Sequence, residues 1–139
     1  MNRFHIGDTI EFTSDLSNIS VVEKLIDNQS AACELNDEVY GKLLLAVVEA
    51  LNNAIVHGNK SDVNKKVTVS YTLDNEFIEY TITNEGEGFN PDILPDPTAP
   101  ENIEKDCGRG IFLMRHLADD VIFSDKGRTV TLKFNLEQQ

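Results

Sequence analysis

Apolar and polar side chains alternate along several stretches of the chain, and this period of two predicts β-strands. Residues 67–73 and 78–84 carry the alternation, and residues 120–124 and 129–136 are interpreted as two further strands. Residues 4–13 mix β-branched and aromatic side chains in rough alternation, which is typical of a strand at the edge of a sheet. The pattern therefore predicts five strands.

Apolar residues spaced three and four apart predict three helices. Ser14 or Asp15 is expected to cap the first helix. The buried stripe of that helix is predicted to be Leu16, Ile19, Val22, Leu25 and Ile26. The second helix is expected from about residue 36 to His57, with Gly58 in the left-handed position that commonly ends a helix. The third helix is expected to begin after Gly108.

These elements predict a two-layer α+β sandwich. Asp74 and Asn75 are expected to join two of the strands in a hairpin. Because side chains alternate along a strand, Asn84 should share the face of the apolar residues that precede it and project toward the helices. Three helices on one face of a mostly antiparallel, mixed sheet give this fold class. A length of 139 residues suits one domain, so we expect residues 1–139 to form a single domain.

The composition excludes several functions and restricts the compartment. The formal net charge is −12, from 24 acidic and 12 basic residues, so direct binding to nucleic acid is not expected. The N-terminal residues become polar too early for a signal peptide, and no apolar run approaches the length of a membrane span. Cys33 is expected in the core and Cys107 near the surface, with no disulfide or metal pattern. We therefore expect a cytoplasmic protein with no membrane partner.

The segment EALNNAIVHGN, residues 49–59, carries the strongest candidate chemistry. Glu49 and Asn53 lie one helical turn apart, so their side chains share a face of an otherwise apolar helix. Such a helix is usually buried, and a buried polar group without a partner costs about 2–7 kcal/mol. The pair therefore indicates a functional site.

Two glycine pairs downstream could complete this site. Gly86 and Gly88, in NEGEGF, allow the backbone to approach a ligand closely. Gly108 and Gly110, in GRGIFLM, lie at the predicted start of a helix, where backbone N–H groups and the helix dipole favour a phosphate.

In their order and spacing, the three segments resemble the asparagine box and the two glycine boxes of the gyrase, chaperone, histidine-kinase and mismatch-repair ATPase superfamily. Within it, the EAxxNAxxHG form, PDPTAPEN and GRGIFLMRHLADDV resemble the bacterial anti-sigma-factor serine kinases, over about residues 10–136. The resemblance implies a histidine-kinase-like ATPase (Bergerat) fold that binds ATP and Mg²⁺. It also implies a serine/threonine protein kinase whose partners are an anti-anti-sigma substrate and a sigma factor, and it leaves a homodimer open.

The resemblance implies a role for three residues. Glu49 would be the general base that accepts the proton of the attacking hydroxyl, the alternative being a solvated helix acid. Asn53 would bind Mg²⁺ through its amide oxygen. Asn84 stands where the family has Asp for adenine, and its amide can accept from the adenine amino group and donate to a ring nitrogen. Because that amide can rotate, discrimination against guanine could be weak.

The other implied nucleotide contacts lie in the two glycine segments. They are Gly86, Gly88, Phe89, Lys105, Gly108, Arg109, Gly110 and Ile111. Lys105 and Arg109 either neutralise phosphate or face solvent as loop charges. His57 is expected to hydrogen-bond at the helix end rather than to bind a ligand.

Two structural expectations concern the same region. Residues 86–106 hold all four prolines and are expected to form a mobile lid over the nucleotide. Ile111 and its neighbours Phe112, Leu113 and Leu117 have the pattern of helix core residues. A non-catalytic adaptor, with or without nucleotide, is the alternative function.

Overall fold

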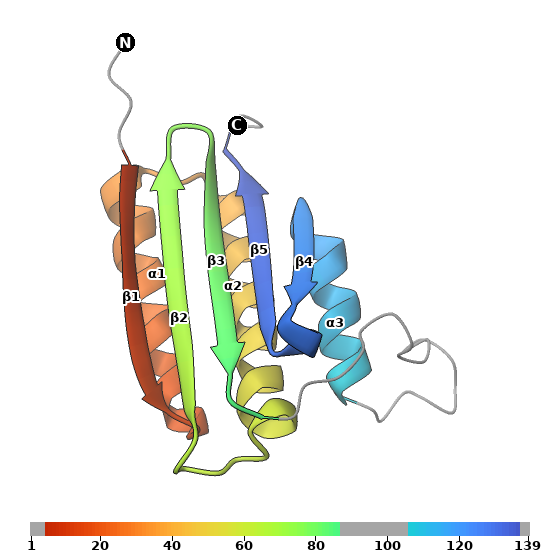
Figure 1. Cartoon of the computed structure of the whole chain (residues 1–139). Helices are drawn as coiled ribbons and strands as arrows, with labels where there is room; N and C mark the ends of the chain where they lie inside the picture. Colours follow the sequence, from red (N-terminus) through yellow and green to blue (C-terminus); the bar gives the residue numbers. More distant parts are fainter. Residues whose placement is uncertain (1–4, 87–105, 137–139) are drawn as a thin grey trace.

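The chain folds into a five-stranded sheet with three helices on one face (Figure 1). The computed structural model describes residues 5–86 and 106–136, with the side chains of residues 7–86 and 109–136. The strands are β1 (His5–Thr13), β2 (Lys66–Asp74), β3 (Phe77–Asn84), β4 (Asp120–Ser124) and β5 (Thr129–Asn135). Their order is β1-β2-β3-β5-β4, and every described pairing is antiparallel. The predicted two-layer α+β class is confirmed, with no parallel pair among the described strands.

Strand β3 positions the first glycine segment as predicted. Its residues alternate between buried and half-buried, and Asn84, at its end, is only 6% exposed on the helix side of the sheet. The register pairs Asn84 with Val67 of β2. The hairpin turn lies one residue later than predicted, because Asp74 accepts hydrogen bonds from the backbone N–H groups of Glu76 and Phe77 at 2.7 and 3.0 Å.

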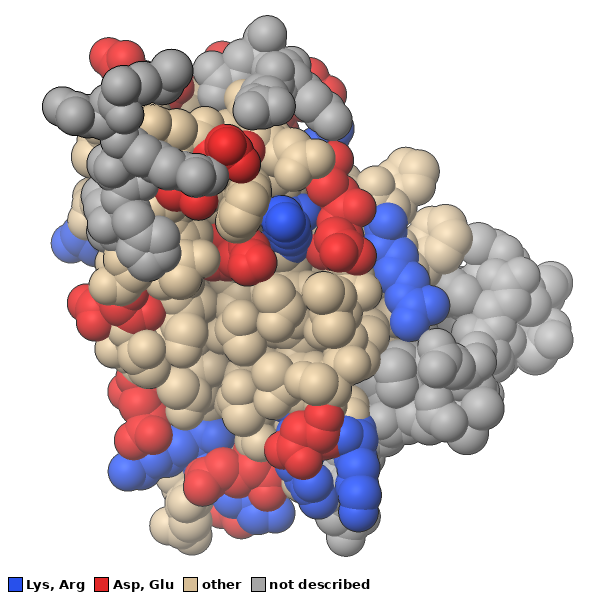
Figure 2. Space-filling view, turned by 45° about the horizontal axis from the view of Figure 1, so that its top comes forward, with Lys and Arg blue, Asp and Glu red and all other residues tan. Residues whose placement is uncertain are grey.

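The opposite face of the sheet is covered by neither helix nor strand in the described part of the chain. Figure 2 shows an uncharged central area there, bordered by acidic and basic side chains. Threonine and serine residues of neighbouring strands bond to each other across strands on this face, as Thr81 does with Thr131 at 3.1 Å. Such pairs stabilise adjacent strands modestly.

Side-chain caps begin the first two helices. Asp15 accepts from the backbone N–H of Ser17 at 2.9 Å and caps a short 3₁₀ turn, η1 (Leu16–Asn18), which continues into α1 (Ile19–Cys33). Asn36 caps α2 (Asp37–Asn52) by accepting from the N–H of Val39 at 2.8 Å. Both helix starts are confirmed.

The end of the second helix differs from the prediction. After Asn52 the helix becomes a π-helical turn, η2 (Asn53–Gly58). Gly58 lies inside this turn and is not left-handed; the left-handed residues are Lys60 and Ser61, with φ of 53° and 57°. The expectation for Gly58 is therefore wrong, and the reason for a glycine there lies in its contacts with β3.

Helix α3 (Asp106–Leu117) begins two residues before Gly108 rather than after it. Ile111 and Met114 are buried, as expected of core residues. Phe112 and Leu113 are 47% and 39% exposed, so the prediction that they belong to the core is wrong. Both side chains are partly open to solvent.

The helical stretch Asp37–Gly58 is long and apolar enough to cross a membrane by length and composition alone. Half of it is buried inside the protein, which is the behaviour of a core helix. It lies between α1 and α3 in the helix layer and packs against the sheet, so its apolar residues have a packing role (Figure 1).

One polar pair lies inside the core. The hydroxyl of Tyr80 on β3 donates to Oε1 of Gln29 on α1, and burial raises the pKa of Tyr80. Gln29 Nε2 has no hydrogen-bond partner in the described part of the chain. The pair is therefore only partly satisfied and depends on the tyrosine hydroxyl.

We expect Tyr80→Phe to lower the free energy of unfolding by about 1–3 kcal/mol, because it leaves the buried Gln29 amide without any partner. Tyr40→Phe is the matched control, since its hydroxyl donates to Asp27 at the surface and its loss should cost less than about 1 kcal/mol. Urea unfolding of both variants measures this. Equal losses would contradict a special role for the buried pair.

Candidate functional site

Asn84 is held in place by backbone groups on both sides of its amide. Its Oδ1 accepts from the N–H of Gly86 at 2.9 Å, and its Nδ2 donates to the carbonyl of Arg128 at 3.3 Å. The backbone N–H of Asn84 donates to the same carbonyl at 2.9 Å. One orientation of the amide is thus assigned by its bonding network.

Two glycines bring the helix and the strand into direct contact. A Cβ added at Gly58 would lie 2.5 Å from Cγ of Asn84, and one added at Gly86 would lie 1.7 Å from the carbonyl oxygen of Gly58. Neither position tolerates a side chain without movement of backbone or of Asn84. Gly86 closely approaches the helix end, and its predicted approach to a ligand stays a prediction.

Glu49 and Asn53 meet the third helix at another glycine. A Cβ at Gly110 would lie 3.1 Å from both amide atoms of Asn53 and 3.2 Å from Oε2 of Glu49. The structure therefore brings these three predicted residues together. Gly110 lies inside α3, so it serves close packing here and is not the first residue of the helix.

Asn53 is buried with both amide atoms unsatisfied. It is 5% exposed, and neither Oδ1 nor Nδ2 has a hydrogen-bond partner in the described residues. Leaving buried polar atoms without partners costs about 1–3 kcal/mol each, so such groups usually have a function. A hard cation is one ligand that would satisfy the oxygen.

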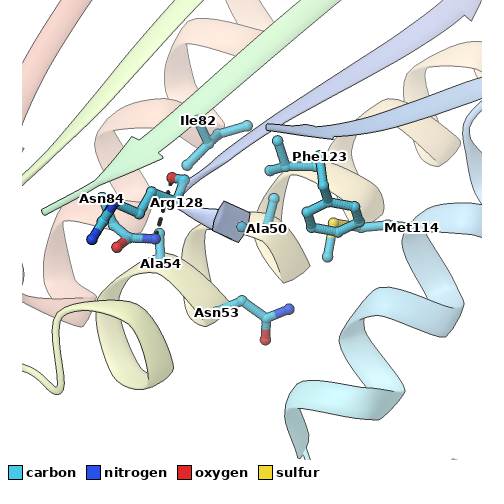
Figure 3. Close-up of a pocket in the computed structure, with 10 residues that line it drawn as sticks. Ala50, Asn53, Ala54, Ile82, Asn84, Met114, Phe123 and Arg128 are labelled. Carbon is cyan, nitrogen blue, oxygen red and sulfur yellow. Dashed lines mark hydrogen bonds between the residues drawn. The ribbon is translucent and has the colours of Figure 1, made fainter. Parts of the chain in front are cut away.

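A small cavity separates Asn84 from the third helix. Figure 3 shows Asn84 and Arg128 at one side, Met114 and Phe123 at the other, and Ala50, Asn53 and Ala54 along the helix between them. The cavity volume is about 10 Å³, which is the space of about one water molecule. Because ligand pockets usually measure about 300–1,000 Å³, the lining side chains must move before a nucleobase enters.

A larger cavity lies on the outer side of Glu49. Its volume is about 350 Å³, and it is lined by Ile19, Val48, Glu49, Asn52, Arg109 and Leu113. Arg109 is exposed here, on the rim shared with Glu49, and its predicted contact with phosphate stays a prediction. Glu49 therefore lines the outer cavity, and Asn53, one helical turn later, lines the inner one.

Two residues of this site, Asn59 and Arg128, were not predicted from the sequence. Asn59 is completely buried and accepts from the N–H of Glu85 at 2.8 Å. Arg128 donates from Nε to the carbonyl of Gly86 at 2.6 Å and pairs with Asp125 at 3.3 Å. The amide directly after the glycine of HGN was the available signal for Asn59. No pattern in the sequence marks Arg128.

His57 does not act as the expected hydrogen bonder at the helix end. Its Nε2 is buried without a hydrogen-bond partner in the described part of the chain, and burial lowers the pKa of His57. A neutral imidazole gains little from the helix dipole. The place of His57 in the last turn of the helix is as predicted, but its Nε2 makes none of the expected hydrogen bonds among the described residues.

Several predicted residues lie outside the described residues. Gly88, Phe89 and Lys105 belong to this group, as does nearly all of the predicted lid, residues 86–106. Only the backbone of Gly108 and Cys107 is described, within α3. Their roles stay predictions.

The fold and the three boxes define a class of protein. A model of the histidine kinase-like ATPase domain matches residues 12–134, and the chain belongs to this family. The superfamily predicted from the three boxes is confirmed. Among the described residues no cluster of three or more His, Cys, Asp or Glu is found, so an Mg²⁺ in this site would depend on ligands other than such a cluster.

Sequence identity to individual proteins indicates a group within this family. The chain is 24% identical to serine-protein kinase RsbW of Listeria monocytogenes, over all of this chain and 94% of that protein. It is 29% identical to the anti-sigma F factor of Geobacillus stearothermophilus, over 95% of this chain and 91% of that protein. It is 36% identical to the anti-sigma F factor of Geobacillus kaustophilus over 63% of each protein. The resemblance to the anti-sigma serine kinases is confirmed.

A solved structure supports the fold. The chain matches the structure of the RsbU and RsbW domains of Rv1364c from Mycobacterium tuberculosis with a TM-score of 0.66 and 14% identity. The match covers 94% of this chain and 32% of the other. At this identity the match supports the fold alone.

We expect Gly58→Ala to lower the free energy of unfolding by about 1–3 kcal/mol, because the new Cβ overlaps the Asn84 amide. Gly41→Ala, in the same helix but with no atom within 4 Å of its Cβ, should instead stabilise by about 0.5–1 kcal/mol. Thermal unfolding of both variants tests the contact. A stabilised Gly58→Ala would mean that the helix and β3 do not touch as described.

Proposed function

We propose that this chain is an anti-sigma regulatory factor that acts as an ATP-dependent serine/threonine protein kinase. Its substrate would be a serine or threonine of an anti-anti-sigma protein, and it would sequester a sigma factor when that protein is phosphorylated. The names of the relatives, serine-protein kinase and anti-sigma F factor, support this assignment. The observation that carries it is the buried, unsatisfied Asn53 beside Glu49 and Gly110.

Asn53 fits the part of an Mg²⁺ ligand. Its amide oxygen is buried and has no protein partner among the described residues, and Asn53 lines the cavity between Asn84 and α3. Mg²⁺ favours oxygen ligands and usually keeps several waters, so one amide and the phosphates of ATP suit it. When bound, the ion would neutralise charge on the phosphates.

Glu49 fits the part of the general base. Its Oε2 would lie 3.2 Å from a Cβ added at Gly110, beside Asn53, and the residue lines the outer cavity. In the proposed reaction the hydroxyl oxygen of the acceptor bonds to the γ-phosphorus of ATP as the bond to ADP breaks. The hydroxyl proton passes to Glu49. Positioning supplies most of the rate in such transfers.

Partner, compartment and domain boundaries belong to the same proposal. We expect a cytoplasmic regulator that binds an anti-anti-sigma protein and a sigma factor, with residues 1–139 as one domain and a homodimer as an open possibility. The alternative of a non-catalytic adaptor is not favoured, because relatives that match nearly the full chain are named as kinases.

We expect Mg·ATP to raise the melting temperature of the wild-type protein and of Glu49→Gln alike, because glutamine keeps the size of the side chain. Phosphoryl transfer should fall about 10²- to 10⁴-fold in Glu49→Gln, since the base is lost. Glu38→Gln, at the exposed start of the same helix, is the control. Single-turnover transfer from γ-labelled ATP to the cognate anti-anti-sigma protein measures this.

Two results would count against the proposal. Transfer by Glu49→Gln at the wild-type rate would exclude Glu49 as the base. A wild-type protein whose melting temperature does not change with Mg·ATP would contradict nucleotide binding itself.

Asn53→Ala should weaken Mg·ATP binding about 10- to 100-fold while leaving Mg-free ATP little affected, because the metal ligand is lost and the base pocket remains. Without nucleotide the variant should be at least as stable as the wild type, since it removes two unsatisfied buried atoms. Calorimetry with Mg²⁺ and with EDTA decides it, and Asn28→Ala on the surface of α1 is the control. Equal losses in both buffers would exclude the metal role.

A further inference from the structure

Asn59 connects four segments of the chain, and two of its partners, Ser14 and Glu85, are far from it in sequence. Its Nδ2 donates to Oγ of Ser14 at 2.8 Å and to the carbonyl of Lys66 at 3.0 Å. Its Oδ1 accepts from the N–H of Glu85 at 2.8 Å, and its backbone N–H donates to the carbonyl of Ala54 at 2.9 Å. The residue is completely buried, so these bonds are shielded from water.

The amide of Asn59 can adopt only one orientation. Ser14 Oγ gives its own proton to the carbonyl of Lys65 at 2.7 Å, so it can only accept from Asn59. The carbonyl of Lys66 also accepts, while the N–H of Glu85 must donate. A flipped amide would place acceptor against acceptor and donor against donor.

The backbone turns sharply after Asn59, next to the end of β3. Lys60 and Ser61 are both left-handed, a region that residues other than glycine rarely adopt. Two bonds hold this turn: the N–H of Ser61 donates to Ile55 at 2.8 Å, and that of Asp62 donates to Asn59 at 3.0 Å. Such strained backbone persists where surrounding contacts fix it, often at functional sites.

Hydrogen bonds from two side chains hold the segment from Asn84 to Gly86. Asn59 holds the N–H of Glu85 on the helix side, and Arg128 holds the carbonyl of Gly86 at 2.6 Å on the β5 side. Gly86 in turn donates to Oδ1 of Asn84. The orientation of the Asn84 amide therefore depends on a segment that Asn59 holds in place.

A fixed Asn84 amide presents a defined pattern to a base. One lone pair of Oδ1 and one hydrogen of Nδ2 remain after the bonds to Gly86 and Arg128. A base with an amino donor beside a ring-nitrogen acceptor matches this pattern, as adenine does. Guanine reverses the order of donor and acceptor on the corresponding edge.

We propose that Asn59 is a positioning residue for nucleobase recognition: by anchoring Glu85 it keeps the Asn84 amide in one orientation and makes the site select adenine over guanine nucleotides. The inference rests on the proposed function, because it concerns the same nucleotide site. An asparagine amide can rotate, so the sequence alone does not give the orientation of the Asn84 amide. The hydrogen bonds around Asn59 would fix that orientation.

The test is calorimetry with Mg·ATP and Mg·GTP on wild type, Asn59→Ala and Gln29→Ala. Wild type should bind ATP more tightly than GTP. Asn59→Ala should raise the ATP dissociation constant about 10- to 100-fold, as for residues that orient a ligand-binding side chain. It should also bring the ratio of the ATP affinity to the GTP affinity close to one. The effect of Mg²⁺ on ATP binding should persist, since the Asn53 side chain is untouched.

Gln29→Ala is the matched control, because it also removes a buried amide with a buried partner but lies in the helix–sheet core. It should lower the melting temperature and leave the ATP-to-GTP ratio unchanged. If Asn59→Ala does not fold, Ser14→Ala replaces it. That variant removes one bond of Asn59 and should raise the ATP dissociation constant about fivefold, with a smaller ratio.

Three results overturn the inference. The first is a wild type that binds ATP and GTP equally well. The second is an ATP-to-GTP affinity ratio in Asn59→Ala, or in its substitute, that equals the wild-type ratio. The third is a change of this ratio in Gln29→Ala as large as that in Asn59→Ala. In each of these cases ATP binding by the wild type leaves the kinase proposal standing. Failure of the wild type to bind either nucleotide would overturn both.

Discussion

The direct contact between the backbones of Gly58 and Gly86 is the constraint on which the rest of the site depends. It lets the helix that carries Glu49 and Asn53 reach the end of β3, where Asn84 lies against Gly58. A side chain at either glycine would separate the two elements by the width of a methyl group or more. The hydrogen bonds of Asn59 and Arg128 hold the same junction, so packing and polar contacts act together there.

Stability and function make opposite demands on this region. Most buried polar groups are satisfied, as the three bonds of the Asn59 amide illustrate. Asn53 and His57 retain buried atoms without partners among the described residues, which lowers stability. A protein that keeps such groups beside a cavity usually does so because a ligand completes them. The unsatisfied atoms therefore mark the site more sharply than the cavity volume does.

Local periodicity was enough to predict most of the fold. The alternation in β2, β3 and β5 and the caps at Asp15 and Asn36 depend on neighbours a few residues away, so the sequence contains them. The placement of Asn84 on the helix side follows from the same period of two. The spacing of Glu49 and Asn53 on one helix face likewise required no tertiary information.

What could not be predicted depends on contacts between distant segments. Gly58 was assigned a left-handed end position because glycine often has it, yet here it makes room for Asn84. Phe112 and Leu113 follow a helical pattern but are exposed to solvent. Two partners of Asn59, Ser14 and Glu85, lie 45 and 26 residues away along the chain, and no local pattern encodes them.

The π-helical turn Asn53–Gly58 has a consequence for how this segment can be transplanted or aligned. Each π-type bond reaches one residue further back than an α-helical bond, so the turn accommodates more chain per revolution. Deleting a single residue between Asn53 and Asn59 would favour a regular helix and swing Asn59 away from Glu85. The number of residues from Glu49 to Asn59 thus determines how these two residues are placed relative to each other. A chimaera or an alignment gap that alters this number would keep the residues of the motif but lose their arrangement in space.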